Sequence, residues 1–339
     1  MQSNTQTLSN GGGGSTRQGQ SQGGKDDREI IDLAELAGTS DVDLDLSVIG
    51  EDGVYSAEID TDGDGTVDET AEIDMSVGDS ITLIGTDGDN TFLGTDGDDV
   101  FIGSAGDDVI VGGDGTDIID YSDLDAPISI SSAGGLDKGD LGTDTLGTFD
   151  VAAGEIAVVE TVIGDKGEQN VVDSTSVQGA VATDVNLASG AYTWTIIEDT
   201  GGFAAGDTFS LTLENFVDVL GSDNDDQIVG SRQDNLLTGA AGEDVIEGGR
   251  GEDTINGGTD DDVLTGGSGA DVFEFVEGDG TDVVTDFDVG VDALTFSGVD
   301  ASDIEVATDG TDTTITYGDS EIVLTDVVEE DLSSLLLIA

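Results

Sequence analysis

The chain contains no cysteine and no histidine, and it has only one proline and seven basic residues. The absence of cysteine and histidine excludes disulfides, zinc sites built from thiolate or imidazole, and serine–histidine catalysis. The sequence has 77 acidic residues, and the formal net charge is -70. This charge excludes a nucleic-acid partner, because phosphate binding needs a basic surface, and it argues against docking on anionic lipid. It favours cations.

Aromatic residues and long apolar runs are also scarce. Aromatics make up 4% of the 339 residues, too few for an ordinary large core. No apolar run approaches the roughly 18 residues of a membrane span. The glycine- and glutamine-rich segment 1–28 has no apolar region of a secretory signal peptide, so we expect a disordered tail there. An expression tag is a weaker interpretation.

Glycine and aspartate, by contrast, recur at a fixed spacing of nine residues. Four nonamers fill residues 85–120, beginning with GTDGDNTFL, and six fill residues 221–274, ending with GGSGADVFE. In all ten, position six is aspartate or asparagine and position eight is apolar. The position-six residues are Asn90, Asp99, Asp108 and Asp117 in the first block, and Asp226, Asn235, Asp244, Asp253, Asp262 and Asp271 in the second.

The nonamer is readily interpreted as a tight turn followed by a short strand. Glycine permits the positive φ angles of such a turn, and position eight would point inward. One turn and strand cannot bury that side chain alone, whereas stacked copies can, which predicts a solenoid. Two nonamers would form one coil, so copies two apart would stack at about 4.8 Å. We therefore expect an all-β fold with one narrow core.

This stacking brings the position-six carboxylates together. Two like charges about 4 Å apart repel by roughly 4 kcal/mol at an effective dielectric near 20, so we expect a cation between them. Calcium takes six to eight oxygens and tolerates irregular geometry, and two stacked loops offer carboxylates and backbone carbonyls. The predicted pairs are Asn90/Asp108, Asp99/Asp117, Asp226/Asp244, Asp244/Asp262, Asn235/Asp253 and Asp253/Asp271. Adaptation to high salt would explain excess acid elsewhere but needs no nine-residue register.

The nonamers GGRGEDTIN (248–256) and GGSGADVFE (266–274) resemble the GGxGxDxUx repeat of the RTX, or haemolysin-type calcium-binding, family. The resemblance implies calcium-loaded parallel β-roll segments, and with them we expect a β-rich insert and a C-terminal β cap. Residues 275–298 resemble the segment that closes such rolls, where Phe273, Phe275, Phe287 and Phe296 would cap the core. Between the blocks, IIDYSDLDAPISI and VVETVIGDKGEQNVV resemble degenerate linking stretches of the same family.

Several residues depart from the family pattern. Asn90 and Asn235 replace aspartate at position six and are weaker ligands. Position four is not glycine at Asn224, Gln233 and Asp260, so we expect wider turns and poorer sites there.

A separate acidic motif, DTDGDGTVDE, occupies residues 60–69. It matches the first half of a D-x-D-x-D-G calcium loop, with candidate ligands Asp60, Asp62, Asp64 and Asp68. The twelfth place is Ala71 instead of a bidentate glutamate, and the flanks alternate like strands, so the motif is not a standard EF-hand. It is either a calcium-binding hairpin loop or a plain acidic turn.

No catalytic motif of the H-E-x-x-H, G-x-S-x-G or P-loop type is present. A carboxylate glycosidase stays open on chemistry alone, but nearly every acidic pair lies in a calcium-type turn. We expect a secreted, non-enzymatic calcium-binding protein with a structural role at the cell surface, in a matrix, filament or surface layer. The alternative is an export or folding module of an adhesin, toxin or hydrolase system.

The resemblance further implies type I secretion through an uncleaved C-terminal signal, VVEEDLSSLLLIA. A final strand or helix packed on the cap fits that segment equally. We expect the chain to divide into a tail (1–28), a small acidic β-region (29–80), the first repeat block (81–120), an insert with degenerate repeats (121–220), the second block (221–274), and a cap with the signal (275–339).

The outward positions of the two blocks differ in character. The second block has mostly polar residues at position nine, which indicates a solvated face. The first block has apolar outward residues, namely Leu93, Val100, Ile102, Val109, Val111 and Ile118. Such apolar area is rarely left open, so either the insert or another protomer should cover it. We favour self-association through the first roll.

Overall fold

The computed structural model describes residues 7–10, 17–18, 29–32, 42–45, 54–59, 69–74, 80–131, 135–146, 148–150, 155–157, 159–175, 181–196, 208–328 and 336–338. The chain forms two compact units. Unit 1 contains residues 1–129 and 134–168, and unit 2 contains residues 130–133 and 169–339. The division falls inside the 121–220 insert, and the finer domain boundaries given above stay predictions.

Unit 1 is built from short strands. They are β1 (Thr7–Asn10), β2 (Arg17–Gln18), β3 (Glu29–Asp32), β4 (Val42–Asp45), β5 (Val54–Ile59), β6 (Glu69–Asp74), β7 (Ile81–Ile84), β8 (Asn90–Leu93), β9 (Val100–Ile102), β10 (Val109–Val111), β11 (Ile118–Asp120), β13 (Gly135–Asp137), β14 (Thr143–Leu146), β15 (Thr148–Asp150), β16 (Glu155–Ala157) and β17 (Thr161–Ile163), with a 3-10 turn, η1 (Gly139–Leu141). Strand β12 (Ser129–Ser131) lies at the division.

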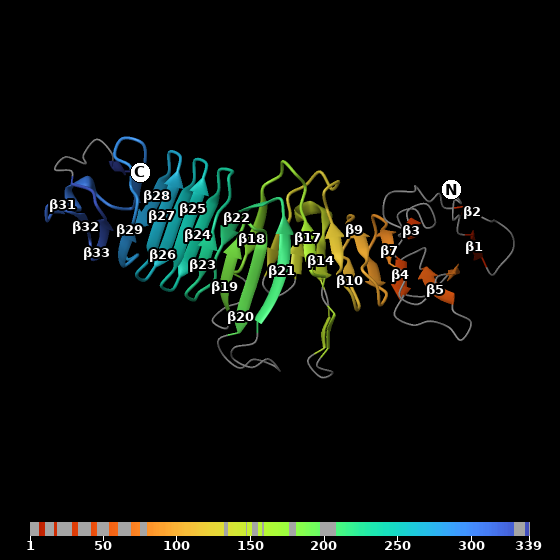
Figure 1. Ribbon diagram of the computed structural model, residues 1–339. Coiled ribbons are helices and arrows are strands. Elements are labelled where there is room, and N and C mark those ends of the chain that lie inside the picture. Colours follow the sequence, from red (N-terminus) through yellow and green to blue (C-terminus); the bar gives the residue numbers. More distant parts are fainter. Residues whose placement is uncertain are drawn as a thin grey trace. The chain divides into compact units, whose positions relative to one another are not determined.

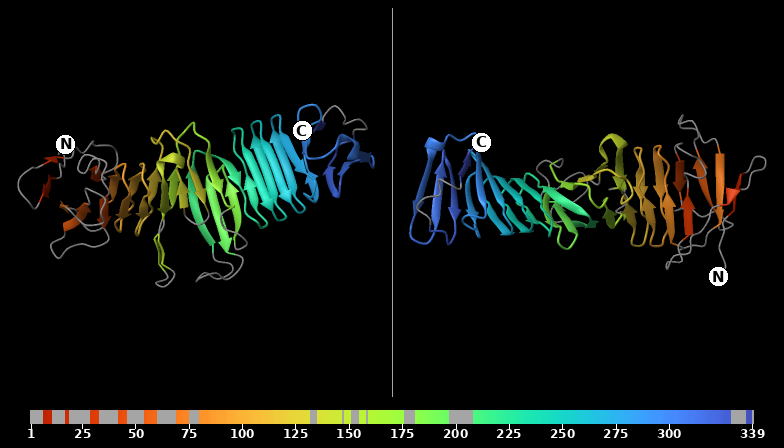
Figure 2. Two further views of the ribbon diagram at one scale, coloured as in Figure 1. Left: turned by 180° about the vertical axis from the view of Figure 1, so that it is seen from behind. Right: turned by 90° about the horizontal axis from the view of Figure 1, so that it is seen from above.

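Two parallel sheets face each other across the core of unit 1. One runs β3-β7-β9-β11-β17 and the other β4-β8-β10-β14. Val109 pairs with Thr91 and Ile118 with Val100, so the register between coils of the first block is 18 residues. Two nonamers therefore make one coil, as predicted. Figure 2 shows these strands of residues 81–120, coloured orange to yellow, as successive rungs.

The region before the first block extends the same roll. Strand β3 pairs in parallel with β7, and β4 with β8. Strands β5 and β6 pair antiparallel, with Val54 opposite Asp74 and Ile59 opposite Glu69. This pairing confirms the predicted strands on both sides of the acidic motif. The motif's candidate ligands Asp60, Asp62, Asp64 and Asp68 lie outside the described residues. Within the predicted tail, β1 and β2 form a short antiparallel pair.

Unit 2 has the same architecture. Its strands are β18 (Asn170–Asp173), β19 (Val181–Asn186), β20 (Ala191–Ile196), β21 (Thr208–Glu214), β22 (Phe216–Leu220), β23 (Gln227–Val229), β24 (Leu236–Ala241), β25 (Val245–Arg250), β26 (Thr254–Thr259), β27 (Val263–Ser268), β28 (Val272–Val276), β29 (Thr281–Val284), β30 (Ala293–Ser297), β31 (Ile304–Thr308), β32 (Thr313–Tyr317), β33 (Ser320–Leu324) and β34 (Leu336–Ile338), with a 3-10 turn, η2 (Ala301–Asp303).

One parallel sheet of unit 2 contains β18, β22, β24, β26, β28, β30 and β34, and the other contains β19, β23, β25, β27, β29 and β33 (Figure 1). The register is 18 residues within the second block, where Ile246 pairs with Leu264. After the block, antiparallel strands β31, β32 and β33 finish the sheet. These pairings establish the parallel β-roll predicted from the repeats.

Position eight forms the core of both rolls, as predicted. All ten of its side chains are at most 2% exposed, and they are Phe92, Phe101, Ile110, Ile119, Ile228, Leu237, Ile246, Ile255, Leu264 and Phe273. The predicted aromatic cap is also buried. Its rings pack in contact, with 6.2 Å between the centroids of Phe273 and Phe287 and 5.9 Å between those of Phe275 and Phe296. Tyr317 adds a ring 5.1 Å from Phe296.

The outer faces differ from the sequence-based expectation. In the first block, Val100, Ile102, Val109 and Ile118 are only half-buried and Val111 is buried. In the second block, the apolar residues at position seven are the more exposed ones, with Leu236, Val245 and Val263 between 38% and 49% exposed. Leu236 lies on the sheet of β24 and β26, whereas Val245 and Val263 lie on the sheet of β25 and β27, so both outer faces of the second block carry exposed apolar residues beside the polar position-nine residues. No helix in the described part of the chain is both long and apolar enough to cross a membrane.

Candidate metal centre

The position-six side chains form columns, in which each residue stacks on the equivalent residue one coil away. We name each column by its first residue. The four columns contain Asn90, Asp108 and Asp144; Asp99, Asp117 and Glu160; Asp226, Asp244, Asp262 and Asp282; and Asn235, Asp253, Asp271 and Asp292. All the aspartates and asparagines are at most 7% exposed.

One oxygen of each side chain is used by the fold itself. The backbone N–H of a column residue donates to Oδ1 of the next residue in the column. The N–O distances are 2.9 Å from Asn90 to Asp108, 2.7 Å from Asp226 to Asp244 and 2.8 Å from Asn235 to Asp253. The remaining predicted pairs, Asp99/Asp117, Asp244/Asp262 and Asp253/Asp271, show the same bond at 2.8–3.0 Å. The structure therefore brings all six predicted pairs together.

The second carboxylate oxygen has no partner in several column residues. Among the described residues, four buried carboxylate oxygens lack any hydrogen-bond partner, and they are Oδ2 of Asp117, Asp244, Asp253 and Asp262. A buried, unpaired carboxylate oxygen is costly, because it has lost its water and gained nothing in return. All four belong to position-six columns.

A glycine at position one leaves room beside each of these oxygens. A Cβ added to Gly248 would fall 2.5 Å from Asp253 Oδ2 and 2.7 Å from the carbonyl oxygen of Gly266. The places beside Gly239 and Gly257 are likewise taken by Oδ2 of Asp244 and Asp262. Position-one glycine therefore lets a carboxylate and a carbonyl of the next coil converge.

The electrostatics of the columns also call for positive charge. Burial, together with the nearby Asp226 and Asp262 carboxylates, raises the pKa of Asp244 to about 8. Burial raises the pKa of Asp117 and Asp262 to about 7 and that of Asp253 to about 6. A carboxyl group with such a pKa binds protons near neutral pH unless another cation stabilises the ionised form.

This donor set fits calcium. It consists of hard oxygens only, from carboxylates and backbone carbonyls, and calcium accepts such ligands in irregular numbers and geometry. In the described part of the chain, no group of three or more acidic side chains converges on one point. Much of any coordination shell would therefore come from backbone carbonyls of the turns.

The sequence reasoning missed four column members, namely Asp144, Glu160, Asp282 and Asp292. They follow their column neighbours by 36, 43, 20 and 21 residues instead of 18, so the regular period does not reveal them. A signal existed for Asp144, because GDLGTDTLG (139–147) has glycine at positions one and four, aspartate at six and leucine at eight. Its Leu146 pairs with Ile110.

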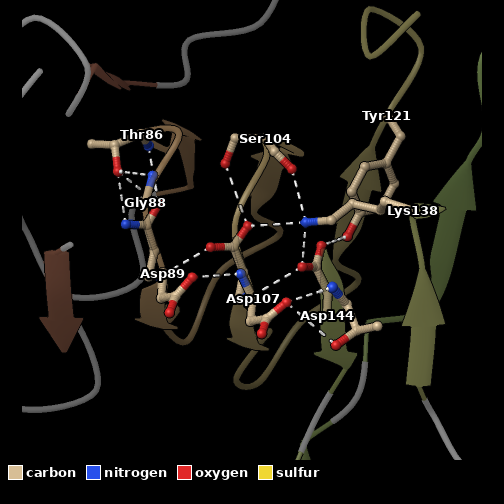
Figure 3. A network of polar contacts seen from close by, with 11 residues as sticks. Thr86, Gly88, Asp89, Ser104, Asp107, Tyr121, Lys138 and Asp144 are labelled. Carbon is tan, nitrogen blue, oxygen red and sulfur yellow. Dashed lines mark hydrogen bonds and ion pairs between the residues drawn. The ribbon is translucent and has the colours of Figure 1, made fainter. Parts of the chain in front are cut away.

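A second ladder at position five was also missed. Here the side chain of one coil accepts a hydrogen bond from the backbone N–H of the next, for example from Asp107 to Asp89 at 2.8 Å (Figure 3). The same bond joins Thr116 to Asp98 and Glu252 to Asp234. These side chains are exposed, so the ladder aligns the turns from outside while the columns align them from within.

The departures from the pattern have local explanations. Asn90 and Asn235 each begin a column, and their amides donate to Thr86 Oγ1 at 2.9 Å and to the Val217 carbonyl oxygen at 2.6 Å. The side-chain amide nitrogen of each asparagine thus donates a hydrogen bond at a place where a second carboxylate oxygen would need a cation. At position four, Asp260 adopts the left-handed conformation of glycine, with φ 84°. Whether these sites bind calcium more weakly stays a prediction.

Comparison with known proteins agrees with this geometry. The family model of the RTX calcium-binding nonapeptide repeat (4 copies) matches residues 84–119, 220–255 and 248–284. The two blocks are RTX calcium-binding nonapeptide repeats. The 18-residue register stacks these repeats into a parallel β-roll in each unit. The first match ends at residue 119, before the column spacing grows to 36 and 43 residues, whereas the last match runs to residue 284 and includes Asp282, which follows Asp262 by 20 residues.

Several solved structures are similar to the chain. The extracellular lipase LipA from Serratia marcescens matches at 18% identity and a TM-score of 0.32, over 77% of this chain and 42% of its own. The chain thus spans less than half of the lipase. The AlgE6R3 and AlgE6R2 subunits of the Azotobacter vinelandii mannuronan C5-epimerase are each 29% identical, over 35% and 36% of this chain and 80% and 92% of theirs, with TM-scores of 0.28 and 0.29. None of the curated proteins searched matches the chain.

Proposed function

We propose that this RTX-repeat protein is secreted and non-enzymatic, folds on calcium outside the cell, and serves a structural role at the cell surface as part of a matrix, filament or surface layer. The observation that carries the proposal is the repeated, unpartnered Oδ2 of Asp117, Asp244, Asp253 and Asp262. These oxygens, with backbone carbonyls of the stacked turns, would hold several calcium ions. Bound calcium supplies the positive charge that lets the columns ionise while they stay buried.

Calcium supply outside the cell would then act as the folding signal. In a chain with a net charge of -70, closing the rolls without a cation brings buried carboxylates together. Extracellular calcium modules typically bind in the roughly 0.1–1 mM range, well above intracellular free calcium. The chain would remain open before export and close afterwards. Export by a type I secretion host, and its loss when residues 327–339 are deleted, tests the proposed route.

A structural role requires that copies associate, and we propose the outer faces of the first roll as the contact. Strands β14 and β17 of the insert pair edge to edge with β10 and β11, so they lengthen the sheets instead of lying over the outer faces. The half-buried Val100, Ile102, Val109 and Ile118 thus lie on faces that a second copy could bury further.

Charge reversal at Val109 tests this contact by light scattering in calcium. If wild type associates and Val109→Asp remains a folded monomer, the first roll is the interface. If Val109→Asp leaves the assembly state unchanged and only lowers thermal stability, the cover is internal and the assembly role fails. Val245→Asp, on the outer face of the second roll, is the matched control and should leave the association unchanged.

A further inference from the structure

A buried ammonium group lies inside the Asn90 column. Lys138 immediately precedes η1, and its side chain is fully buried. Its Nζ lies 3.4 Å from Asp108 Oδ2, donates a hydrogen bond to Asp144 Oδ1, and donates to the backbone carbonyl oxygen of Ser104 at 2.8 Å (Figure 3). The ammonium therefore contacts two column carboxylates and a turn carbonyl, which are the same kinds of donor that calcium would use.

The surrounding residues fix this ammonium in place. The Tyr121 ring is fully buried, its centroid is 5.9 Å from Lys138 Nζ, and its hydroxyl donates to Asp144 Oδ2. The ring lies against Gly103, where an added Cβ would collide with it. The Lys138 N–H donates to the Gly142 carbonyl oxygen at 2.8 Å and closes the turn.

The turn itself takes the place of a nonapeptide turn. The Gly106 N–H donates to the Leu141 carbonyl oxygen at 2.8 Å, and the Thr143 N–H donates to Asp107 Oδ1 at 2.7 Å. The turn that carries Lys138 is thus docked on the preceding coil through both its backbone and the position-five ladder.

The other columns have no such group. Asp117, Asp244, Asp253 and Asp262 each keep a buried Oδ2 without a partner, whereas Asp108 and Asp144 are both paired with Lys138. Within the part of the chain that the structure describes, the only ion pairs are those two. With seven basic residues in the whole sequence, a lysine buried in a column is a specific feature and not a consequence of composition.

We propose that the Lys138 ammonium is a built-in cation that replaces calcium between Asp108 and Asp144, so that this side of the first roll closes without calcium. The inference rests on the proposed function only in that the other columns take calcium. A lysine supplies one positive charge and three hydrogen-bond donors. Its attraction to buried carboxylates offsets the cost of removing them from water only when the donors are all well placed on acceptors, as they are here. In a stacked array, folding can start at one coil and spread to its neighbours. The coils joined by Lys138 would be the place where folding starts.

Hydrogen exchange in excess chelator tests the calcium-free half of the proposal. The backbone amides of Asn90 and Asp108, which donate along the column, should be protected in wild type and in Lys166→Met. Lys166 is exposed, so that variant is the control with the same change in net charge. In Lys138→Met the two amides should exchange on the order of 100-fold faster, because two buried carboxylates lose their only cation. Equal exchange in wild type and Lys138→Met would overturn the proposal.

Ion counting by calorimetry tests the calcium-loaded half. Lys138→Met should bind one calcium ion more than wild type, and Lys166→Met the same number as wild type. An unchanged count in Lys138→Met would contradict the proposal. Should Lys138→Met fail to fold even in calcium, wild-type crystals decide, since anomalous scattering should show ions beside Oδ2 of Asp244 and Asp262 and none between Asp108 and Asp144.

The failure of this proposal and that of the proposed function look different. A calcium ion between Asp108 and Asp144 in wild type, with Lys138 turned away, overturns the Lys138 proposal alone. A wild type that binds no calcium anywhere overturns the proposed function, while the exchange comparison in chelator still decides the role of Lys138.

Discussion

Each column aspartate performs two tasks with its two oxygens. Oδ1 accepts the N–H of the preceding coil and fixes the stacking register, as Asp253 does for Asn235 at 2.8 Å. Oδ2 has no hydrogen-bond partner in Asp117, Asp244, Asp253 and Asp262, and under the proposed function it binds a cation. Asparagine has no second oxygen, and the two asparagines stand at the start of their columns, where Oδ1 accepts an N–H of their own turn, from Thr86 to Asn90 and from Ser231 to Asn235.

Substitution of Asp253 separates the two tasks. Asp253 is stacked between Asn235 and Asp271, so Asp253→Ala should impair two adjacent calcium sites, and Asp226→Ala, at the start of its column, only one. Asp253→Asn should lose calcium in the same way but keep the bond to the Asn235 N–H. Calorimetric stoichiometry measures the first effect. In saturating calcium, Asp253→Ala should also be about 1–3 kcal/mol less stable than Asp253→Asn, because a buried N–H is left unpaired. Equal calcium losses from Asp253→Ala and Asp226→Ala would contradict the stacking order.

The raised pKa values of the column predict how pH acts on the calcium-free protein. Because burial raises the pKa of Asp253 to about 6, of Asp262 to about 7 and of Asp244 to about 8, these groups favour the folded state in the protonated form. Their contribution to stability is complete below about pH 4, the ordinary aspartate pKa, and is lost as pH rises through 6 to 8. Thermal melts in chelator should therefore show higher midpoints at pH 5 than at pH 8.

In saturating calcium this dependence of the melting midpoint on pH should reverse, because protons compete with the ion for the carboxylates. A pH-independent midpoint in chelator would contradict the account.

At the scale of the element, the nonamer works because its turn is shaped by glycines that neighbouring oxygens approach closely. Position-one glycines such as Gly257 have no positive φ angle, so their need for glycine is steric, from the Oδ2 of Asp262. Glycines at positions two and four, such as Gly249 and Gly251, combine positive φ with a close carbonyl of the preceding coil.

A pair of glycine substitutions distinguishes crowding at the metal from backbone strain. Gly257→Ala places a methyl group against Asp262 Oδ2 and should weaken calcium binding at that step by roughly tenfold or more, since the ligand must move. Gly298→Ala is the control, because Gly298 has φ 75° and nothing within 4 Å of its added Cβ. It should cost about 1–2 kcal/mol of stability from the left-handed backbone and leave calcium affinity unchanged. Calcium titrations of both variants measure this, and equal affinities would argue against ligands at the turn.

The nonamer could be predicted from sequence because each of its features has a local physical cause. Position eight, the two-nonamer coil and the six stacked pairs all follow from a strict period of nine. The period fails where the chain makes a detour and returns to the stack, so Asp144 and Glu160 were missed although they occupy column positions. Lys138 could not be found in this way, because its role depends on a turn folded back onto Ser104 and Asp108. The pairing of β3 and β4 with the first block was hidden for the same reason.

At the scale of the whole molecule, 77 acidic residues against seven basic ones can be explained either by high-salt adaptation or by metal binding. The two explanations make different demands. Surface charge for high salt needs only screening, and any abundant monovalent cation provides it. The buried columns instead need an ion that is coordinated by several oxygens at once, which monovalent salt does not replace. The nine-residue register and the unpartnered buried oxygens belong to the second explanation.

The most direct test of the central claim, that cations in the position-six columns close the rolls, is circular dichroism of the full chain during a calcium titration from excess chelator. The account predicts a largely disordered spectrum in chelator, with residual β signal from the coils joined by Lys138. It also predicts a cooperative gain of β structure toward millimolar calcium, because metal binding is then folding free energy. Molar potassium chloride should not produce the same gain. A full β spectrum in chelator, unchanged by added calcium, would contradict the account.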